Sequence, residues 1–328
     1  MKILITGGAG FIGSTLADRL LSYSNDIIVI DNFNDFYDPK IKENNIKNNL
    51  NNKNYKLYRG DIEDCEFVKK IFRENKINSV VHIAAHAGIY SSIQNPLACA
   101  KTNIDGTINI LNAMQEFGVK KIVFASSSSV YGNCRKEKFS EDMKTAEPIS
   151  PYAATKSACE QFIYTYSKLY NIQAICLRFF TVYGPKQRPD LAIRKFAELM
   201  EQDKPIPVYG DGTTIRDYVY IDDVIEALLS ALKYDKSQYE IINIGSGLPV
   251  TLNQMIETIE KFIGKKAKIN RLPMQAGDVN KTVSDISKAK KLLNYYPKVS
   301  FEEGIRKFIE WKKANKNPKD DANLPFLQ

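Results

Sequence analysis

The chain has 328 residues, of which 44% are hydrophobic and 26% are charged, an ordinary balance for a globular protein. It contains no run of about 18 apolar residues, which excludes a membrane-spanning helix. Its formal net charge is +8, but the basic residues are scattered, so the sequence predicts an anionic small substrate as partner and no nucleic acid.

The first half of the chain alternates apolar runs of strand length with segments of helical periodicity. The predicted strands are 2–6, 27–31, 56–59, 79–84, 120–125 and 173–179. The predicted helices between them are 11–23, 65–74, 97–117 and 152–170. This alternation, with strands of buried type, indicates a doubly wound, Rossmann-like parallel sheet covered by helices on both faces. The Asn- and Lys-rich segment 44–54 is interpreted as a solvated insertion.

The second half is less regular and is punctuated by prolines. It contains helical patterns at 191–202, 221–233, 252–263 and 301–313, and a predicted strand at 240–244. We expect residues 1–180, together with 213–246, to form the Rossmann-like domain. Residues 181–212 and 247–314 then form a smaller C-terminal α/β lobe that binds substrate, followed by a flexible tail at 315–328.

Three glycines follow the first predicted strand. Gly7, Gly10 and Gly13 form G-x-x-G-x-x-G at the start of the first helix. Such a turn needs residues that tolerate positive φ and a backbone bare enough to approach a pyrophosphate, which binds the unpaired amides of the helix. The pattern predicts a dinucleotide site in the domain 1–180, although the glycines could instead serve only a tight turn.

An acidic residue ends the second predicted strand. Asp31 stands 18 residues after Gly13, close to the spacing of about 20 that is typical of dinucleotide-binding folds. A carboxylate here accepts hydrogen bonds from the adenosine ribose and repels a 2′-phosphate. The next residue is Asn32 rather than Arg. The sequence therefore predicts NAD rather than NADP as cofactor.

A Tyr and a Lys are spaced to share one face of a helix. Tyr152 and Lys156 stand at i and i+4 in the predicted helix 152–170. A nearby ammonium lowers the pKa of a phenol, which predicts Tyr152 as a general base. The hydroxyls of 126–129 follow a strand and lie at the carboxyl edge of the sheet, where ligands bind in this fold class. On its own, however, such a Tyr–Lys pair is usually a surface pair.

Five cysteines are widely spaced and include no Cys-x-x-Cys pair. Their odd number argues against a disulfide framework and against a structural zinc site, so no metal ligand is predicted. The apolar N-terminus leads directly into glycines and is not typical of a signal peptide. We therefore expect a cytoplasmic protein.

Together these motifs resemble the extended short-chain dehydrogenase/reductases that act on nucleotide sugars. The resemblance implies that Ser127 assists Tyr152 and that Lys156 also holds the nicotinamide ribose. It also implies NAD that stays bound through turnover, and homodimers formed through the helices 97–117 and 152–170. It assigns further cofactor contacts to Phe11, Ile12, Asp61, Ile62, Ala84, Ala85 and Asn103.

Two positions discriminate among the reactions of this group. Ser128 and Ser129 stand where the related 4,6-dehydratases carry Asp-Glu, and Glu takes the place of Ser129 in the related decarboxylases. Without those proton-transfer groups both reactions are disfavoured, which leaves 4-epimerisation through a 4-keto intermediate. Segments 31–39, 179–185, 188–190 and 272–278 most resemble UDP-glucuronate 4-epimerases.

This resemblance implies that hydroxyls and an arginine bind the sugar carboxylate, since an Arg fork suits a carboxylate. The residues concerned are Ser128, Ser129, Thr181 and Arg188. Contacts with uridine diphosphate are expected from Val208, Tyr209, Arg216, Tyr218, Gln275 and Asp278. Two positions depart from the family: Tyr90 replaces a usual Arg, and His86 replaces a usual Gln. A 4-epimerase of neutral UDP-hexose or UDP-N-acetylhexosamine, and a non-catalytic dinucleotide-binding protein, remain alternatives.

Overall fold

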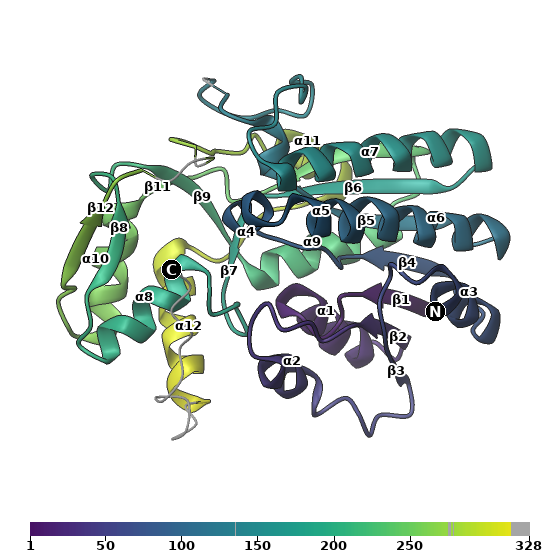
Figure 1. Cartoon of the computed structure of the whole chain (residues 1–328), viewed down its shortest axis with the longest axis horizontal. Coiled ribbons are helices and arrows are strands. Elements are labelled where there is room, and N and C mark those ends of the chain that lie inside the picture. Colours follow the sequence, from purple (N-terminus) through teal and green to yellow (C-terminus); the bar gives the residue numbers. More distant parts are fainter. Residues whose placement is uncertain (135, 275–276, 278, 316–328) are drawn as a thin grey trace.

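Seven parallel strands form the central sheet of the chain (Figure 1). The computed structural model describes residues 1–134, 136–274, 277 and 279–315. The strand order is β10-β6-β5-β4-β1-β2-β3. The bounds are β1 Lys2–Thr6, β2 Asp26–Asp31, β3 Tyr55–Arg59, β4 Ser79–His82, β5 Lys121–Ser127, β6 Gln173–Phe179 and β10 Tyr239–Ile244. The predicted Rossmann-like α/β class is confirmed.

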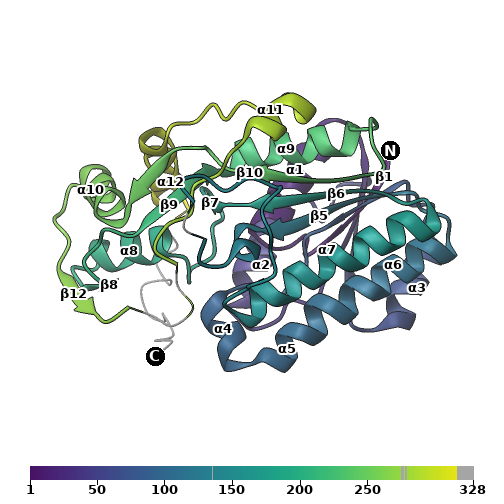
Figure 2. The same ribbon diagram turned by 90° about the horizontal axis from the view of Figure 1, so that it is seen from above.

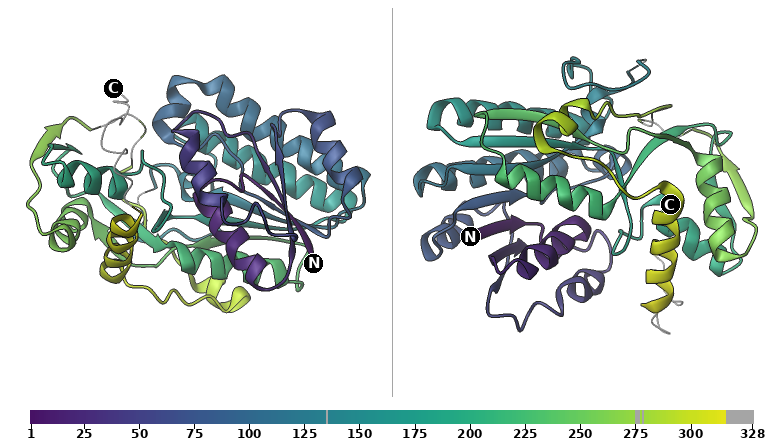
Figure 3. Two further views of the ribbon diagram at one scale, coloured as in Figure 1. Left: turned by 90° about the horizontal axis from the view of Figure 1, so that it is seen from below. Right: turned by 180° about the vertical axis from the view of Figure 1, so that it is seen from behind.

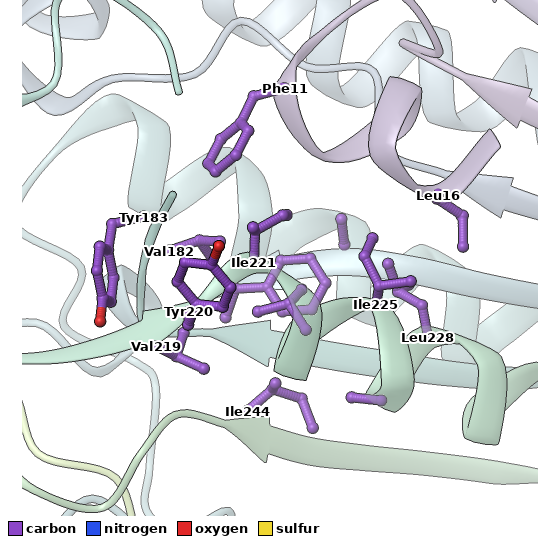
Figure 4. Packing of buried hydrophobic residues seen from close by; sticks show 14 of the residues in the cluster. Phe11, Leu16, Val182, Tyr183, Val219, Tyr220, Ile221, Ile225, Leu228 and Ile244 are labelled. Atoms are coloured by element: carbon purple, nitrogen blue, oxygen red, sulfur yellow. The ribbon is translucent and has the colours of Figure 1, made fainter. Parts of the chain in front are cut away.

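Helices cover both faces of this sheet because successive strand residues point to opposite sides. Ile3 and Ile5 of β1 belong to one buried cluster and Leu4 to another. Figure 2 shows α3 (Cys65–Glu74), α6 (Gly106–Glu116) and α7 (Pro151–Tyr170) on one face. The other face carries α1 (Phe11–Ser22) and α9 (Ile221–Lys233), and in Figure 4 Ile225 and Leu228 of α9 lie near Leu16 of α1.

Two small sheets lie beside the central one. One has the order β11-β9-β7 and the other pairs β12 with β8. The bounds are β7 Thr181–Tyr183, β8 Ile206–Tyr209, β9 Ile215–Tyr220, β11 Pro249–Thr251 and β12 Ile269–Leu272. The helices of this part are α8 Ala192–Glu201, α10 Leu252–Ile263 and α12 Phe301–Ala314. A further helix, α11 Ser287–Leu293, packs against β10 of the central sheet and against α9. From behind, α9 runs along the central sheet and α10 lies at the far end (Figure 3). The domain boundaries stay a prediction, and beyond Asn315 the predicted tail lies outside the described residues.

Two segments differ from the sequence analysis. The predicted helix 97–117 is interrupted by a π-helical turn, Lys101–Asp105, between α5 (Pro96–Ala100) and α6. The segment 44–54 is not simply a solvated insertion, because it follows on from a helix, α2 (Pro39–Ile46). Ile46 at the end of α2 is fully buried, and the Asn49 amide donates to Asp18 at 2.5 Å. Within the described part of the chain, no helix combines the length and apolarity that crossing a membrane requires.

Candidate active site

The turn after β1 and the first turn of α1 leave no room for a side chain at Gly7 and Gly13. Gly7 has φ +69° and donates its N–H to the Ile30 carbonyl at 2.8 Å. A Cβ on Gly7 would lie 2.9 Å from the Ala84 backbone, and one on Gly13 only 2.3 Å from the Gly7 carbonyl oxygen. Helix α1 begins directly after Gly10. The backbone amides at its start can therefore be approached by a phosphate, as a dinucleotide site requires.

The side chains predicted to bind adenosine gather at the carboxyl ends of β2 and β3. The Asp31 carboxylate accepts from the backbone N–H of Ala9 and of Phe33, each at 2.9 Å. The Asn32 amide donates to the Asp61 carboxylate at 2.8 Å. Each carboxylate oxygen has further acceptor capacity, so Asp31 can still bind ribose hydroxyls.

The other predicted cofactor residues differ in how far they are buried and in which groups a cofactor could contact. The Ala84 N–H donates to the Thr6 hydroxyl at 3.1 Å, and Ala85 follows it half-buried. Ile62 is buried against Gly106, and the side chain of Phe11 lies in the core (Figure 4), so Phe11 offers only its backbone. Ile12 is partly buried. Among these residues, the glycine turn, Asp31 and Asp61 form the part that fits NAD.

Asn103 is a positioning residue in the π-helical turn. It is 2% exposed, and its amide oxygen accepts from the His86 N–H at 2.7 Å. Its amide nitrogen donates to Thr155 of α7 at 2.9 Å. Asn103 therefore holds the loop after β4 against α7.

A buried histidine under the glycine turn was not identified from the sequence. Its Nδ1 lies 2.7 Å from the Thr6 hydroxyl and its Nε2 lies 3.0 Å from the Thr107 hydroxyl. Burial lowers the pKa of His82 to about 3, and the nearby Lys156 acts in the same direction. His82 is thus a neutral member of the hydrogen-bond network that supports this edge of the sheet. An ionisable residue in an otherwise apolar strand was the signal that could have identified it.

Ser127, Tyr152 and Lys156 come together at the end of β5. The Ser127 hydroxyl acts on the Tyr152 phenol and favours its ionised form, which lowers the pKa of Tyr152. Ser129 donates to the Ser127 hydroxyl from its own hydroxyl at 2.7 Å and from its N–H at 3.2 Å. The Lys156 ammonium donates to the Ala125 carbonyl at 2.7 Å and lies 6.0 Å from the centre of the Tyr152 ring.

The electrostatics of Tyr152 differ from the sequence-based expectation. Burial raises the pKa of Tyr152, and the hydrogen bond from Ser127 and the charge of Arg188 lower it by less. Burial also lowers the pKa of Lys156. The prediction that Lys156 leaves the phenol with a lowered pKa was wrong for this structure, because desolvation of the phenolate outweighs the favourable charges.

Arg188 is already paired. Its Nε and Nη2 donate to the two Asp190 carboxylate oxygens at 2.9 and 2.6 Å, and Nη2 also reaches the Ala87 carbonyl at 3.3 Å. The guanidinium lies 5.2 Å from the centre of the Phe36 ring. The sequence analysis left this fork free for a sugar carboxylate. In the structure one edge of it is occupied by an acid only two residues away.

A cleft of about 1730 Å³ brings Ser127, Tyr152 and Arg188 together, and it is larger than the roughly 300–1,000 Å³ of most small-molecule sites. Lys156, Asp31, Asp61 and the glycine turn are not in its lining. The predicted residues that line it are Ser127, Ser128, Ser129, Tyr152, Thr181, Arg188, Tyr209, Arg216 and Tyr218. Val208 is not among them, because its side chain is fully buried in the core. Gln275 and Asp278 lie outside the described residues.

The cleft is also lined by residues that the sequence analysis did not assign to substrate binding. Phe36 and Tyr37 approach from the segment before α2, His86 from the loop after β4, and Tyr90 from the short helix α4 (Ile89–Gln94) that follows this loop. The Nε2 atom of His86 is buried and has no hydrogen-bond partner among the described residues. Across those same residues, no group of three or more His, Cys, Asp and Glu side chains is placed to hold a metal ion.

Comparison with known proteins identifies the class. The family model described as GDP-mannose 4,6 dehydratase matches residues 4–308, and the chain belongs to this family of extended short-chain dehydrogenase/reductases. The predicted resemblance is confirmed.

Particular relatives narrow the class further. The UDP-glucuronate 4-epimerase of Thermodesulfobacterium geofontis is 44% identical over 313 residues, covering 95% of this chain and 96% of the relative. The structure of UDP-glucuronic acid 4-epimerase from Bacillus cereus, with UDP-glucuronic acid and NAD, matches with TM-score 0.90 and 36% identity over 96% and 99% of the two chains. UDP-glucose 4-epimerase from Thermotoga maritima, with UDP-glucose, matches with TM-score 0.89 and 35% identity over 96% and 99%.

Proposed function

We propose that this chain is an NAD-dependent UDP-sugar 4-epimerase that interconverts UDP-glucuronate and UDP-galacturonate. The observation that carries the proposal is that Ser127 and Tyr152 line the same cleft and that the Ser127 hydroxyl lowers the pKa of the Tyr152 phenol, with Ser128 and Ser129 in the same lining. Proton transfer at the single carbon C4 needs only Tyr152 and its partner Ser127. The Asp-Glu pair of the dehydratases is absent, because Ser128 and Ser129 stand at those positions. The epimerase relatives from Thermodesulfobacterium geofontis and Bacillus cereus support the same reaction.

The residues present fit NAD. The turn at Gly7, Gly10 and Gly13 would hold the pyrophosphate, and Asp31 with Asp61 the adenosine. Held there, NAD would supply the hydride acceptor and donor at C4 of the sugar that epimerisation through a 4-keto sugar requires. Lys156 would hold the nicotinamide ribose from its buried position beside Ala125.

Tyr152 is the proton acceptor in this proposal. As phenolate it takes the proton of the sugar 4-hydroxyl, and it returns that proton when the 4-keto sugar is reduced. Burial works against the phenolate, so the hydrogen bond that Ser127 supplies is needed to stabilise it. Ser129 donates to the Ser127 oxygen, which leaves the Ser127 proton available to Tyr152.

The sugar carboxylate is bound chiefly by hydroxyls in this proposal. A 4-keto glucuronate is a β-keto acid and loses CO2 when its carboxyl C–C bond aligns with the ketone π system. Ser128, Ser129 and Thr181 line the cleft and can hold the carboxylate out of that alignment. Because Asp190 occupies the Nε and Nη2 edge of Arg188, Arg188 has only Nη1 to add to them.

One observation favours a second candidate, a 4-epimerase of neutral UDP-hexoses or UDP-N-acetylhexosamines. The Arg188–Asp190 pair neutralises the arginine that would attract an anionic sugar. The similarity to UDP-glucose 4-epimerase from Thermotoga maritima supports this alternative. The two candidates share the chemistry of Tyr152 and differ only in the sugar.

Proton NMR of the sugar tests the proposal. Purified protein is incubated with UDP-glucuronate, first without and then with added NAD, and UDP-glucose and UDP-N-acetylglucosamine are run in parallel. Formation of UDP-galacturonate without added NAD establishes the substrate and a retained cofactor. Turnover of only the neutral sugars selects the second candidate, and no turnover of any sugar with NAD present rejects both.

We also propose that the protein is a homodimer through α5 and α7. Leu97 is 82% exposed and Leu169 is 68% exposed, and Phe162 of α7 is exposed as well. Apolar side chains of this size on adjacent helices are typical of an interface between subunits. Light scattering on the purified protein tests this, and Leu97→Glu with Leu169→Glu should give a monomer.

The proposed compartment is the cytoplasm. All five cysteines are free, and Cys99, Cys159 and Cys176 are buried. Buried thiols without disulfides suit a reducing compartment. Fractionation of the source cells tests this assignment.

A further inference from the structure

Three side chains of α7 contact three consecutive residues at the end of β5. Tyr152, Lys156 and Glu160 are each four residues apart, so they form one stripe along the helix. The Tyr152 phenol is close enough to the Ser127 hydroxyl for this hydroxyl to lower its pKa, and the Lys156 ammonium donates to the Ala125 carbonyl at 2.7 Å. Between these contacts, the Ser126 hydroxyl donates to the Glu160 carboxylate at 2.5 Å. The stripe therefore extends the Tyr-x-x-x-Lys pair by one turn.

Glu160 is held in place from β6. Arg178 donates to its two carboxylate oxygens, from Nε at 2.9 Å and from Nη2 at 2.7 Å. The side chains of Arg178 and Glu160 are 3% and 1% exposed. Arg178 stands directly opposite Ser126 in the β5–β6 register, and its guanidinium lies 4.7 Å from the centre of the Tyr131 ring. One rigid unit thus joins α7, β5 and β6 beneath the site.

Stability alone does not account for this ion pair. Burying two charges costs free energy that their attraction scarcely offsets, and apolar residues of similar volume often stabilise a fold equally well. What the pair supplies is geometry, because a bidentate contact fixes both the position and the orientation of the Glu160 carboxylate. That carboxylate in turn fixes the Ser126 side chain, next to Ser127.

We propose that Glu160 and Ser126 are positioning residues for the epimerisation proposed above. They hold the carboxyl end of β5 so that the Ser127 hydroxyl stays in hydrogen-bond contact with the Tyr152 phenol. The expected effect on kcat rests on the proposed function. The expected effect on the Tyr152 phenol concerns only the chain's own residues and can be measured without substrate.

Ser126→Ala is the sharpest variant, because it cuts the link to β5 and leaves the ion pair intact. We expect kcat to fall about tenfold with KM changed less than twofold, since the lost contact matters for proton transfer rather than binding. The acid limb of the kcat profile should move up by about half a pH unit, because a displaced Ser127 stabilises the phenolate less. The control is Ser167→Ala, which removes another buried serine hydroxyl, this one on α7, whose hydrogen bond goes to the Gln238 carbonyl and not to Glu160.

A second measurement does not depend on activity. Tyrosine labelled at Cζ with carbon-13 is titrated by NMR, and the Tyr152 signal is assigned by its loss in Tyr152→Phe. Besides Ser127, the groups acting on this phenol are Arg188, Cys99 and Cys159, with Lys156 on the same helix, and both serine variants retain all of them. The Tyr152 titration should move upward in Ser126→Ala and stay unchanged in Ser167→Ala.

The ion pair itself is tested with two further variants. Glu160→Gln leaves Arg178 buried without its carboxylate, and it should both destabilise the fold and shift the Tyr152 titration upward. Glu160→Gln combined with Arg178→Met should restore the wild-type melting temperature, whereas Tyr152 should still titrate at a higher pH than in the wild type. If Ser126→Ala and the double variant titrate like the wild type, the positioning role is overturned. A wild type that epimerises none of the sugars rejects the proposed function instead, and leaves the titration result standing.

Discussion

Asp190 holds the guanidinium of Arg188 through both carboxylate oxygens, at 2.9 and 2.6 Å, inside the cleft that also contains Tyr152. A free arginine at this point would be a strong anchor for an anionic sugar, whereas a paired one is nearly neutral to it. The preference of this site for a charged or an uncharged sugar therefore depends on Asp190, which need not contact the reacting carbon.

Asp190→Asn should favour the anionic sugar. The variant removes a negative charge from the cleft and frees one edge of the Arg188 fork, so KM for UDP-glucuronate should fall about fivefold. Any loss of Arg188 positioning affects both sugars, so UDP-glucose serves as the internal control. Steady-state kinetics with the two substrates measure the ratio, and an equal change for both would contradict the role given to Asp190.

Tyr152→Phe should abolish most of the turnover while leaving the fold intact. Loss of a general base typically costs about 10²- to 10⁴-fold in rate, and the phenol oxygen has no role in the core packing. The assay is sugar NMR at saturating substrate, with the melting temperature and retained NAD as controls. A variant that keeps more than a tenth of the wild-type kcat would remove Tyr152 from the mechanism.

Activity should rise with pH on the acid side. The base form of Tyr152 is the active one, and burial raises the pKa of this phenol, so the fraction of phenolate increases as the pH rises towards that pKa. Arg188 lowers the same pKa, so Arg188→Met should move the acid limb of kcat to higher pH. The measurement is kcat from pH 6 to 10, and a limb that moves to lower pH would reverse the assigned effect.

Gly13→Ala should prevent cofactor binding. The added methyl group would lie 2.3 Å from the Gly7 carbonyl oxygen and 2.8 Å from the Gly8 Cα, so the turn must open. NAD released on denaturing the purified protein should be undetectable. Gly118→Ala is the control: Gly118 has φ +72°, unlike Gly13, but a Cβ there meets nothing within 4 Å. It should lose about 1 kcal/mol of stability and keep its NAD.

His82 should make the protein less stable in mild acid. Its pKa is about 3 in the folded chain and about 6.5 when unfolded. Between these values the unfolded state binds more protons, so the free energy of unfolding falls as the pH falls, by up to about 1.4 kcal/mol per pH unit. Above pH 6.5 the group contributes no slope.

Urea unfolding between pH 6.5 and 4.5 measures that slope. His82→Gln should be less stable at neutral pH but lose less stability on acidification than the wild type. The protein has two histidines. Burial and Arg188 also lower the pKa of His86, but less than burial lowers that of His82, so the comparison variant His86→Gln should keep most of the steep dependence. Equal slopes for the wild type and His82→Gln would show that this imidazole is not the cause.

The sequence predicts the central sheet well because its elements carry local signals. The strand Gln173–Phe179 and the helices Cys65–Glu74, Ile221–Lys233 and Leu252–Ile263 begin and end as expected from their hydrophobic periodicity. The pairing of β8 with β12 was not predictable in this way, because each strand has four residues and the two are some 60 residues apart in the chain. Such short strands are defined by their partner rather than by their own pattern.

The residues of the candidate site also differ in whether the local sequence predicts them. The glycine turn, Asp31, Ser127, Tyr152 and Lys156 are identifiable because their function depends on spacing within one strand, turn or helix. The Glu160–Arg178 pair was not, because it joins a helix to a strand and neither residue shows in sequence that it is buried. The pairing of Arg188 with Asp190 is local, but only the conformation of their loop turns both side chains to the same side.

In the π-helical turn Lys101–Asp105, the number of residues matters for the structure as much as their identity. A π-helical turn closes hydrogen bonds between residues i and i+5, one residue more than an α-helical turn, so removing one residue here would give a regular helix with α5 and α6 still in phase. Asn103 would no longer stand where the π turn places it, and its contacts with His86 and Thr155 would be lost, whereas Leu97 would stay on the face on which it is exposed. Substitutions in this turn change single contacts, whereas a one-residue deletion would release the loop after β4 from α7 and disturb the cleft without moving the proposed subunit interface.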